Sequence, residues 1–128
     1  PERAQAEKEV QDLQKKLEAR LTTMIETYQG KITEFESDTT LTPAVRRSLQ
    51  SEIQDLQGRI QEFQQTATTE IQVKQNELMS AMFKRVQDAA GEVGKEGGYT
   101  YIFDSGSDAM LYAGGEDVTA KIKTQLGI

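Results

Sequence analysis

The chain has 128 residues, of which 28% are charged and 6% are aromatic, and its net charge is −6. This length suits one domain, and the negative charge argues against nucleic acid as the main partner, because nucleic-acid binding requires clustered lysine and arginine. Cysteine and histidine are both absent, which excludes disulfides, thiol catalysis and histidine-based metal sites. The mean hydropathy of −0.63 leaves little material for a compact core and favours an elongated helical shape.

A first long helix is predicted over residues 2–36. Apolar side chains recur there every three or four residues, as one face of a helix requires. This stripe consists of Val10, Leu13, Leu17, Leu21, Met24, Tyr28, Ile32 and Phe35.

Residues 37–43 interrupt the helical pattern. Asp38 and the neighbouring threonines compete with the helical backbone for hydrogen bonds, and Pro43 has no amide hydrogen. Thr42 is therefore predicted to be the N-cap of a new helix that begins at Pro43. A short break between two long amphipathic helices is typical of an antiparallel hairpin, so residues 37–43 are predicted to form its tip.

The second helix is predicted over residues 43–95. Its apolar stripe has a mean step of about 3.7 residues, close to an eleven-residue repeat, so strong left-handed supercoiling is not required. The stripe consists of Val45, Leu49, Ile53, Leu56, Ile60, Phe63, Ala67, Ile71, Leu78, Met82, Val86, Ala89 and Val93. Lys74 occupies a further stripe position, which indicates either a hydrated seam or an altered register.

If the chain folds back at the tip, residues whose numbers sum to about 79 should lie opposite each other. The stripe of the second helix then continues over residues 78–95 without a partner in this chain. An upstream part of the first helix or another subunit would cover it, and we expect both to contribute. The chain also begins without methionine, so upstream residues are expected to have been cleaved or left out.

Residues 96–128 differ in kind from the helical arm, which is predicted over residues 1–95. Residues 99–104 and 109–113 are β-branched, aromatic or aliphatic, and predict two strands joined by a turn at 105–108. A short final helix is expected to be capped by Asp117, to present Val118, Ile122 and Leu126 on one face, and to end at Gly127.

The predicted strands carry large apolar groups on both faces, and a two-stranded hairpin is marginal by itself in water. The predicted fold class is therefore α+β, a long antiparallel helical hairpin attached to a small β body that is completed by oligomerisation. The residues assigned to oligomerisation are Tyr101, Ile102, Phe103, Met110, Leu111 and Tyr112.

Two patterns that superficially indicate ligand binding do not meet the requirements of their motifs. Residues 104–108 resemble a calcium loop, but Gly106 stands third rather than sixth and Gly115 occupies the position of the required glutamate. The glycines between residues 91 and 98 do not lead from a strand into a helix, as a phosphate-binding loop requires. Helical arms also offer no dry, concave site around a carboxylate pair, so neither enzyme activity nor a cofactor or metal is expected.

Several apolar residues lie beside the stripe or broaden it beyond the needs of a two-helix seam. An exposed apolar band with flexible methionines is suited to adaptable binding of unfolded chains. The residues assigned to such binding are Ile25, Tyr28, Phe35, Leu41, Val73, Met79 and Phe83.

The last 30 residues carry a resemblance to a known family. Residues 101–104 form an apolar segment that ends in aspartate, residues 110–112 a second one that ends in tyrosine, and residues 117–119 an aspartate-aliphatic-threonine cap before Ile122. In this order the elements resemble the Skp/OmpH family of periplasmic chaperones. The arms match that family only as coiled-coil-like helices.

The resemblance implies a homotrimer shaped like a jellyfish, in which three helical hairpins enclose a cavity. It implies an ATP-independent holdase that binds unfolded outer-membrane proteins in the periplasm of a Gram-negative bacterium. The alternative interpretation is a structural coiled-coil spacer or adaptor that binds a folded partner.

Two features depart from the family pattern. The family has a strand ahead of the first helix, which this chain lacks, so an N-terminally trimmed form is expected. Familiar members are basic with positive arm tips, whereas the tip here has Glu34, Glu36 and Asp38 against Arg46 and Arg47. Attraction to lipopolysaccharide or an anionic membrane is therefore not inferred from the resemblance.

Overall fold

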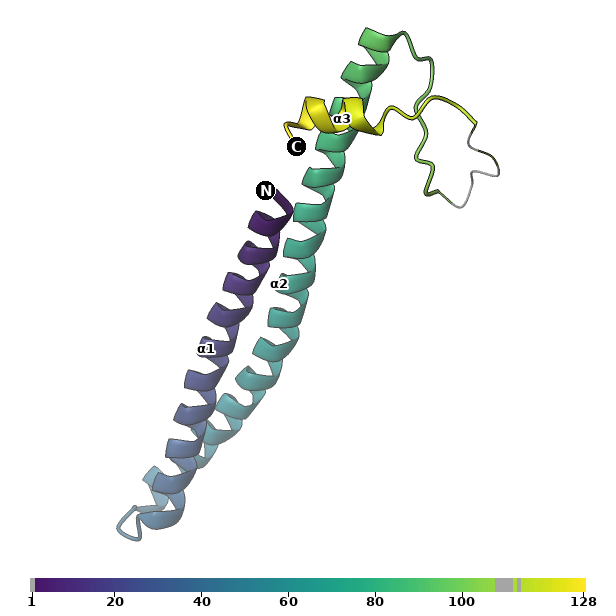
Figure 1. Cartoon of the computed structure of the whole chain (residues 1–128). Coiled ribbons are helices and arrows are strands. Elements are labelled where there is room, and N and C mark those ends of the chain that lie inside the picture. The colour runs from purple at the N-terminus through teal and green to yellow at the C-terminus, as the bar shows by residue number, and fades with distance from the viewer. Residues whose placement is uncertain (1, 108–111, 113) are drawn as a thin grey trace. The chain divides into compact units, whose positions relative to one another are not determined.

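The computed structural model describes residues 2–107, 112 and 114–128. The chain divides into two compact units, Pro1–Asn76 and Glu77–Ile128, which are described separately below. Three α-helices follow one another along the described chain: α1 (Glu2–Ser37), α2 (Pro43–Gly97) and α3 (Thr119–Leu126) (Figure 1). None of the helices in the described ranges is long and apolar enough to cross a bilayer.

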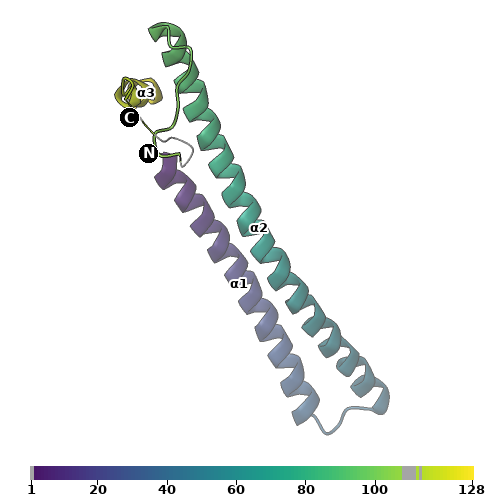
Figure 2. The same cartoon turned by 90° about the vertical axis from the view of Figure 1, so that its right-hand side faces the viewer.

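The first unit is an antiparallel hairpin of α1 and the first part of α2, as the periodicity predicts (Figure 2). The two helices begin and end within two residues of the predicted bounds. Leu17 and Leu49 are buried, and the other apolar stripe residues of α1 are half-buried. A seam between only two helices covers each side chain on one side alone, which explains the partial burial.

The tip is held by side chains that replace missing helical hydrogen bonds. The Thr42 hydroxyl accepts a hydrogen bond from the Val45 backbone N–H at 3.3 Å, which confirms Thr42 as the N-cap of α2. Asp38 accepts hydrogen bonds from both the backbone N–H and the hydroxyl of Thr40. These bonds lower the pKa of Asp38, since they stabilise its charged form.

Arg46 joins the two ends of the tip. Its guanidinium lies 4.9 Å from the centre of the Phe35 ring and donates hydrogen bonds to the carbonyl oxygens of Phe35 and Asp38. These carbonyls lie at the end of α1, where helical partners run out. One side chain of α2 thus closes the end of α1, a role that the sequence pattern did not indicate.

Three cross-helix contacts reveal the register of the hairpin. Lys74 Nζ pairs with the Glu9 carboxylate at 2.9 Å, the Arg20 guanidinium lies 5.0 Å from the centre of the Phe63 ring, and Lys31 pairs with Glu52. Successive contacts are eleven residues apart on both helices. An eleven-residue repeat gives 3.67 residues per turn, so the two helices do not need the left-handed supercoil of a heptad repeat to stay in contact.

The residue numbers of each pair sum to 83 rather than to the predicted 79. Part of this difference has a simple cause. Long side chains lean toward the N-terminus of their own helix, so side chains that meet across an antiparallel pair have higher numbers than the facing backbones. The contact of Lys74 with Glu9 also accounts for the lysine in the apolar stripe, because its charge is paired at the edge of the seam.

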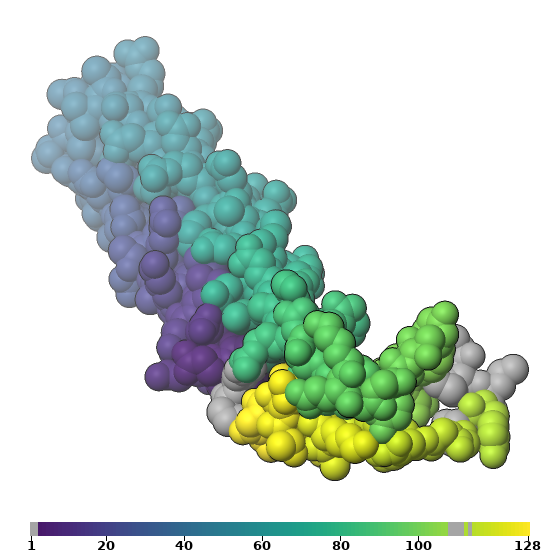
Figure 3. Space-filling view, turned by 90° about the horizontal axis from the view of Figure 1, so that it is seen from above, coloured from purple at the N-terminus to yellow at the C-terminus, as the bar shows by residue number. Residues whose placement is uncertain are grey.

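The second unit is built on the last turns of α2 and on α3. Ala89 and Val93 of α2 and Val118, just before α3, are buried. The space-filling view shows the atoms of α3 against those of the last turns of α2 (Figure 3). Gly98 ends α2 with a φ of 68°, and Gly127 ends α3 with a φ of 75°, the left-handed conformation in which glycine is favoured.

The Asp117 carboxylate accepts a hydrogen bond from the Thr119 backbone N–H at 2.9 Å, although Val118 is the N-cap residue of α3. The prediction that Asp117 is the N-cap is therefore wrong by one position, and its carboxylate supports the start of the helix from the residue before the N-cap. The predicted end of the helix at Gly127 is confirmed.

The predicted β body is wrong for this chain. The described residues contain no strand, and residues 99–104 run as irregular chain between α2 and a turn at 105–106. The physical reason is that strands apolar on both faces need cover on both, which the single chain does not supply. Most of the second predicted strand, including Met110 and Leu111, lies outside the described residues. The described fold is all-helical.

The ion pair between Lys74 and Glu9 predicts a dependence on pH. The hydrogen bond from Lys74 lowers the pKa of Glu9 below its ordinary value of 4.5. The stability from this pair is therefore present at neutral pH and is lost as the pH falls through the lowered pKa of Glu9. We expect Lys74→Leu, which restores an apolar side chain to the stripe, to raise the urea midpoint at neutral pH and to reduce the loss of stability on acidification.

The matched control is Lys84→Leu, because Lys84 pairs with Asp88 on an exposed side of α2. Urea unfolding at neutral pH and below pH 4.5 measures both variants. Equal effects of the two substitutions would show that the position in the seam has no special importance.

Candidate functional site

The structure places the seven residues assigned to client binding in two different environments. Ile25, Tyr28, Phe35 and Leu41 are half-buried in the hairpin unit. Val73, Met79 and Phe83 are 49%, 65% and 63% exposed. The first four therefore stabilise the hairpin at least in part, whereas the last three present about half or more of their surface to solvent.

Phe35 illustrates the first group. The Arg46 guanidinium lies over one face of the Phe35 ring, and this contact is part of the closure of the tip. The other half-buried residues of this group lie in the seam, beside it, or in the tip. A client could reach these residues only at their exposed edges.

The second unit contains the densest exposed apolar surface of α2. Met79, Phe83 and Val86 are spaced by four and three residues, so they lie on one face of the helix. Their exposed fractions are 65%, 63% and 45%. We call these three residues the apolar row. Ala89 and Val93, which continue the same spacing toward the end of the helix, are buried, so the exposed part of this face ends at Val86.

Residues assigned to oligomerisation are also exposed. Tyr101 and Phe103 stack with their ring centres 5.9 Å apart, and they are 75% and 70% exposed. Tyr112 is 86% exposed. Ile102 is half-buried, with its Cδ1 3.7 Å from where a methyl group on Gly94 would lie. Met110 and Leu111 lie outside the described residues.

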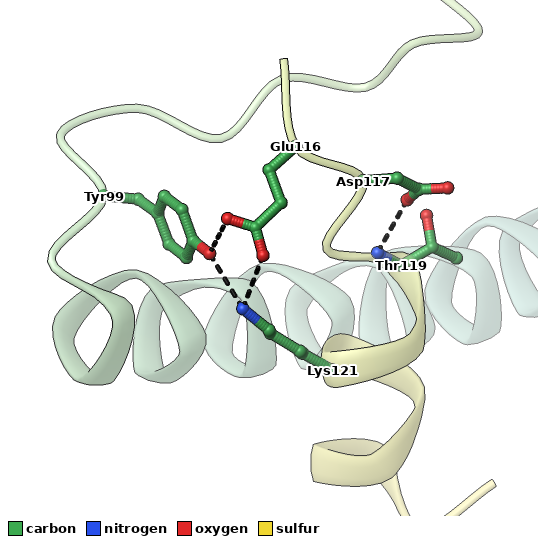
Figure 4. A network of polar contacts seen from close by, with 5 residues as sticks. All are labelled: Tyr99, Glu116, Asp117, Thr119 and Lys121. Carbon is green, nitrogen blue, oxygen red and sulfur yellow. Dashed lines mark hydrogen bonds and ion pairs between the residues drawn. The ribbon is translucent and has the colours of Figure 1, made fainter.

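A polar network joins the end of α2 to the start of α3 (Figure 4). Lys121 Nζ donates hydrogen bonds to the Tyr99 hydroxyl and to the Glu116 carboxylate, both at 2.8 Å. The Tyr99 hydroxyl donates to the other oxygen of Glu116. Each of the three side chains thus contacts the other two.

The network shifts the charge equilibria of its members. Hydrogen bonds from Lys121, and then from Tyr99, lower the pKa of Glu116. The same contacts raise the pKa of Lys121 well above its ordinary value, with the bond to Glu116 as the larger cause. Both groups therefore stay charged at neutral pH, which suits a structural link rather than proton transfer. Sequence reasoning missed this network because its members are 22 positions apart in the chain.

The described residues contain no cluster of acidic side chains that could hold a metal ion. Two exposed apolar and aromatic surfaces are candidates for binding. They consist of the apolar row on α2 and the stacked pair of Tyr101 and Phe103.

One family model, described as Outer membrane protein (OmpH-like), matches residues 1–126. The chain belongs to this family. This match confirms the resemblance to the Skp/OmpH family that the C-terminal residues indicated. The match also covers both long helices, α1 and α2. No curated protein and no solved structure matched the chain.

Membership of the OmpH-like family has consequences for the kind of role. The family is one of periplasmic chaperones for outer-membrane proteins in Gram-negative bacteria, and it is not a family of enzymes. Oligomerisation and binding of outer-membrane proteins are general features of the family. Exposed apolar side chains on a helical arm are consistent with such a role.

Two glycines of α2 provide a test of the network in this OmpH-like protein. A methyl group on Gly97 would overlap the Tyr99 ring, whereas one on Gly91 would meet open space. We expect Gly91→Ala to stabilise the protein by about 1 kcal/mol, the usual gain in helix propensity. Gly97→Ala should displace the Tyr99 ring from Lys121 and Glu116.

Hydrogen exchange of the α3 amides measures the difference, since the network holds the start of α3. Exchange should be faster in the Gly97 variant than in the Gly91 variant. Unchanged α3 protection in both would mean that the network does not hold the helix in place.

Proposed function

We propose that this OmpH-like protein is an ATP-independent holdase that binds unfolded outer-membrane proteins in the periplasm and prevents their aggregation. The observation that supports this function best is the apolar row of Met79, Phe83 and Val86, which stays exposed on a continuous helix. Large apolar side chains gathered on one face of a soluble protein are typical of an interaction surface.

The side chains of the row suit a client without fixed structure. Methionine has three rotatable bonds and a polarisable sulfur, so Met79 adapts to differently shaped partners. Phe83 supplies a large apolar area that excludes water wherever a client side chain covers it. Each contact alone is weak, so the client is held by their number and is released without an energy source.

We also propose that three copies assemble and that their helical hairpins enclose the client. Tyr101, Phe103 and Tyr112 support self-association, because each is at least 70% exposed in the single chain. Aromatic residues are enriched in the cores of protein interfaces. Burial between copies would remove the exposed aromatic surface from water.

The holdase function is tested with the double variant Met79→Gln and Phe83→Gln. A urea-unfolded β-barrel membrane protein is diluted into buffer without ATP, and its aggregation is followed by light scattering. Wild-type protein should suppress aggregation, and the variant should bind the client about tenfold more weakly, since it loses most of two exposed apolar side chains.

The matched control is Ser80→Ala with Gln87→Ala, two other exposed positions on the same helix. This control should suppress aggregation like the wild type. If wild-type protein fails to suppress aggregation and instead binds one folded partner tightly, the chain is an adaptor rather than a holdase.

The assembly is tested by measuring the mass of the protein in solution. Wild-type protein should have three times the chain mass, and Tyr101→Ser with Phe103→Ser should shift the equilibrium toward single chains. A stable dimer or tetramer, or a trimer that tolerates both substitutions, would contradict the proposed interface.

A further inference from the structure

One face of α2 within the hairpin unit carries no charged side chain. Its positions follow one another every three or four residues, and all of them are exposed. Six carry primary amides: Gln54, Gln57, Gln61, Gln64, Gln72 and Gln75. Thr68 occupies the remaining position. This amide face extends from residue 54 to residue 75, which is about 32 Å of helix.

The absence of charge is specific to this face. Another exposed row of the same helix carries Asp55, Arg59, Glu62 and Glu70. The solvent-facing sides of α1 also carry charges along their length. With 28% charged residues in the chain, the amide face is a segregated surface rather than the average composition of the exterior.

The amide face takes no part in holding the hairpin together. The cross-helix ion pair with Lys31 comes from Glu52, which belongs to the charged row of α2. Within the part of the chain that the structure describes, the side-chain amides of the six glutamines have no hydrogen-bond partner in the protein. Each amide therefore offers two N–H donors and a carbonyl acceptor to another molecule.

We infer that the amide face binds the main chain of an unfolded polypeptide. This inference deepens the proposed holdase function and rests on it. A glutamine amide has the same donors and acceptor as a peptide group, so the two form hydrogen bonds in either direction. An uncharged surface also gives no preference for acidic or basic segments, and the contact is therefore independent of the client sequence.

The same chemistry separates unfolded from folded proteins. A folded protein pairs its peptide groups in its own helices and sheets, whereas an unfolded chain leaves them free. Each exchange of water for an amide contributes little, because hydrogen bonds replace hydrogen bonds. Six amides in a row supply affinity through their number, and the client leaves as soon as its own backbone becomes paired.

The experiment is a double-mutant cycle between the amide face and the client backbone. The probe is a strand-forming peptide from a β-barrel membrane protein, made in two forms of the same sequence. In one form, alternate backbone nitrogens are methylated, which removes their donors and leaves every side chain in place. The protein variant carries Gln57→Ala, Gln61→Ala, Gln64→Ala and Gln72→Ala.

The control variant carries Arg59→Ala, Glu62→Ala, Thr66→Ala and Thr69→Ala. These four residues are exposed on the same stretch of α2, and the net charge stays the same. Methylation should weaken binding to the wild type and to the control by about tenfold, and binding to the glutamine variant by only about twofold.

The possible outcomes separate this inference from the holdase function. Equal effects of methylation on the wild type and the glutamine variant would overturn the inference and leave the holdase function standing. A change in the solution mass of the glutamine variant would mean that the amide face is buried between copies, which also overturns the inference. If the wild type binds neither peptide, both the inference and the proposed function fail.

Discussion

The hairpin depends on the eleven-residue register in which α1 and α2 meet. Glu9, Arg20 and Lys31 on one helix contact Lys74, Phe63 and Glu52 on the other at regular intervals. A repeat of 3.67 residues per turn keeps the two helices in contact along their length without the left-handed supercoil that a heptad repeat imposes. The tip then only has to reverse the chain, and Arg46 closes it with contacts to Phe35 and Asp38.

A two-helix seam uses little of the surface of either helix, and this has consequences for function. A three-layer core would bury most faces of α2, whereas here only the stripe is covered. The remaining faces of α2 in the hairpin differ in their side chains, because packing does not constrain them. One face is charged and another carries amides. In the proposed function, stability and binding draw on different residues of one helix, so a substitution that alters one need not alter the other.

The sequence pattern predicts the local features of this fold well and its long-range features poorly. Helix bounds, the tip and the caps at Thr42 and Gly127 follow from periodicity and from residues that act on their immediate neighbours. The register, the link from Arg46 to α1 and the contact of Lys121 with Tyr99 join residues far apart in the chain. The β body failed for a related reason, since strand propensity describes a residue on a covered surface and the described residues provide no such cover.

The candidate site shows the same division. Spacing alone indicated Met79 and Phe83 as exposed apolar residues, but it could not separate them from Phe35, which also lies at a helical position and is covered by Arg46. The amide face was missed because the sequence analysis followed the apolar and charged positions of the second helix and not its uncharged polar ones. An unfolded transmembrane strand alternates apolar and polar side chains along a backbone that is free throughout. Under the proposed function, a holdase for such chains gains from both kinds of surface, because the apolar row would contact every second side chain and the amides would contact the backbone that all residues share.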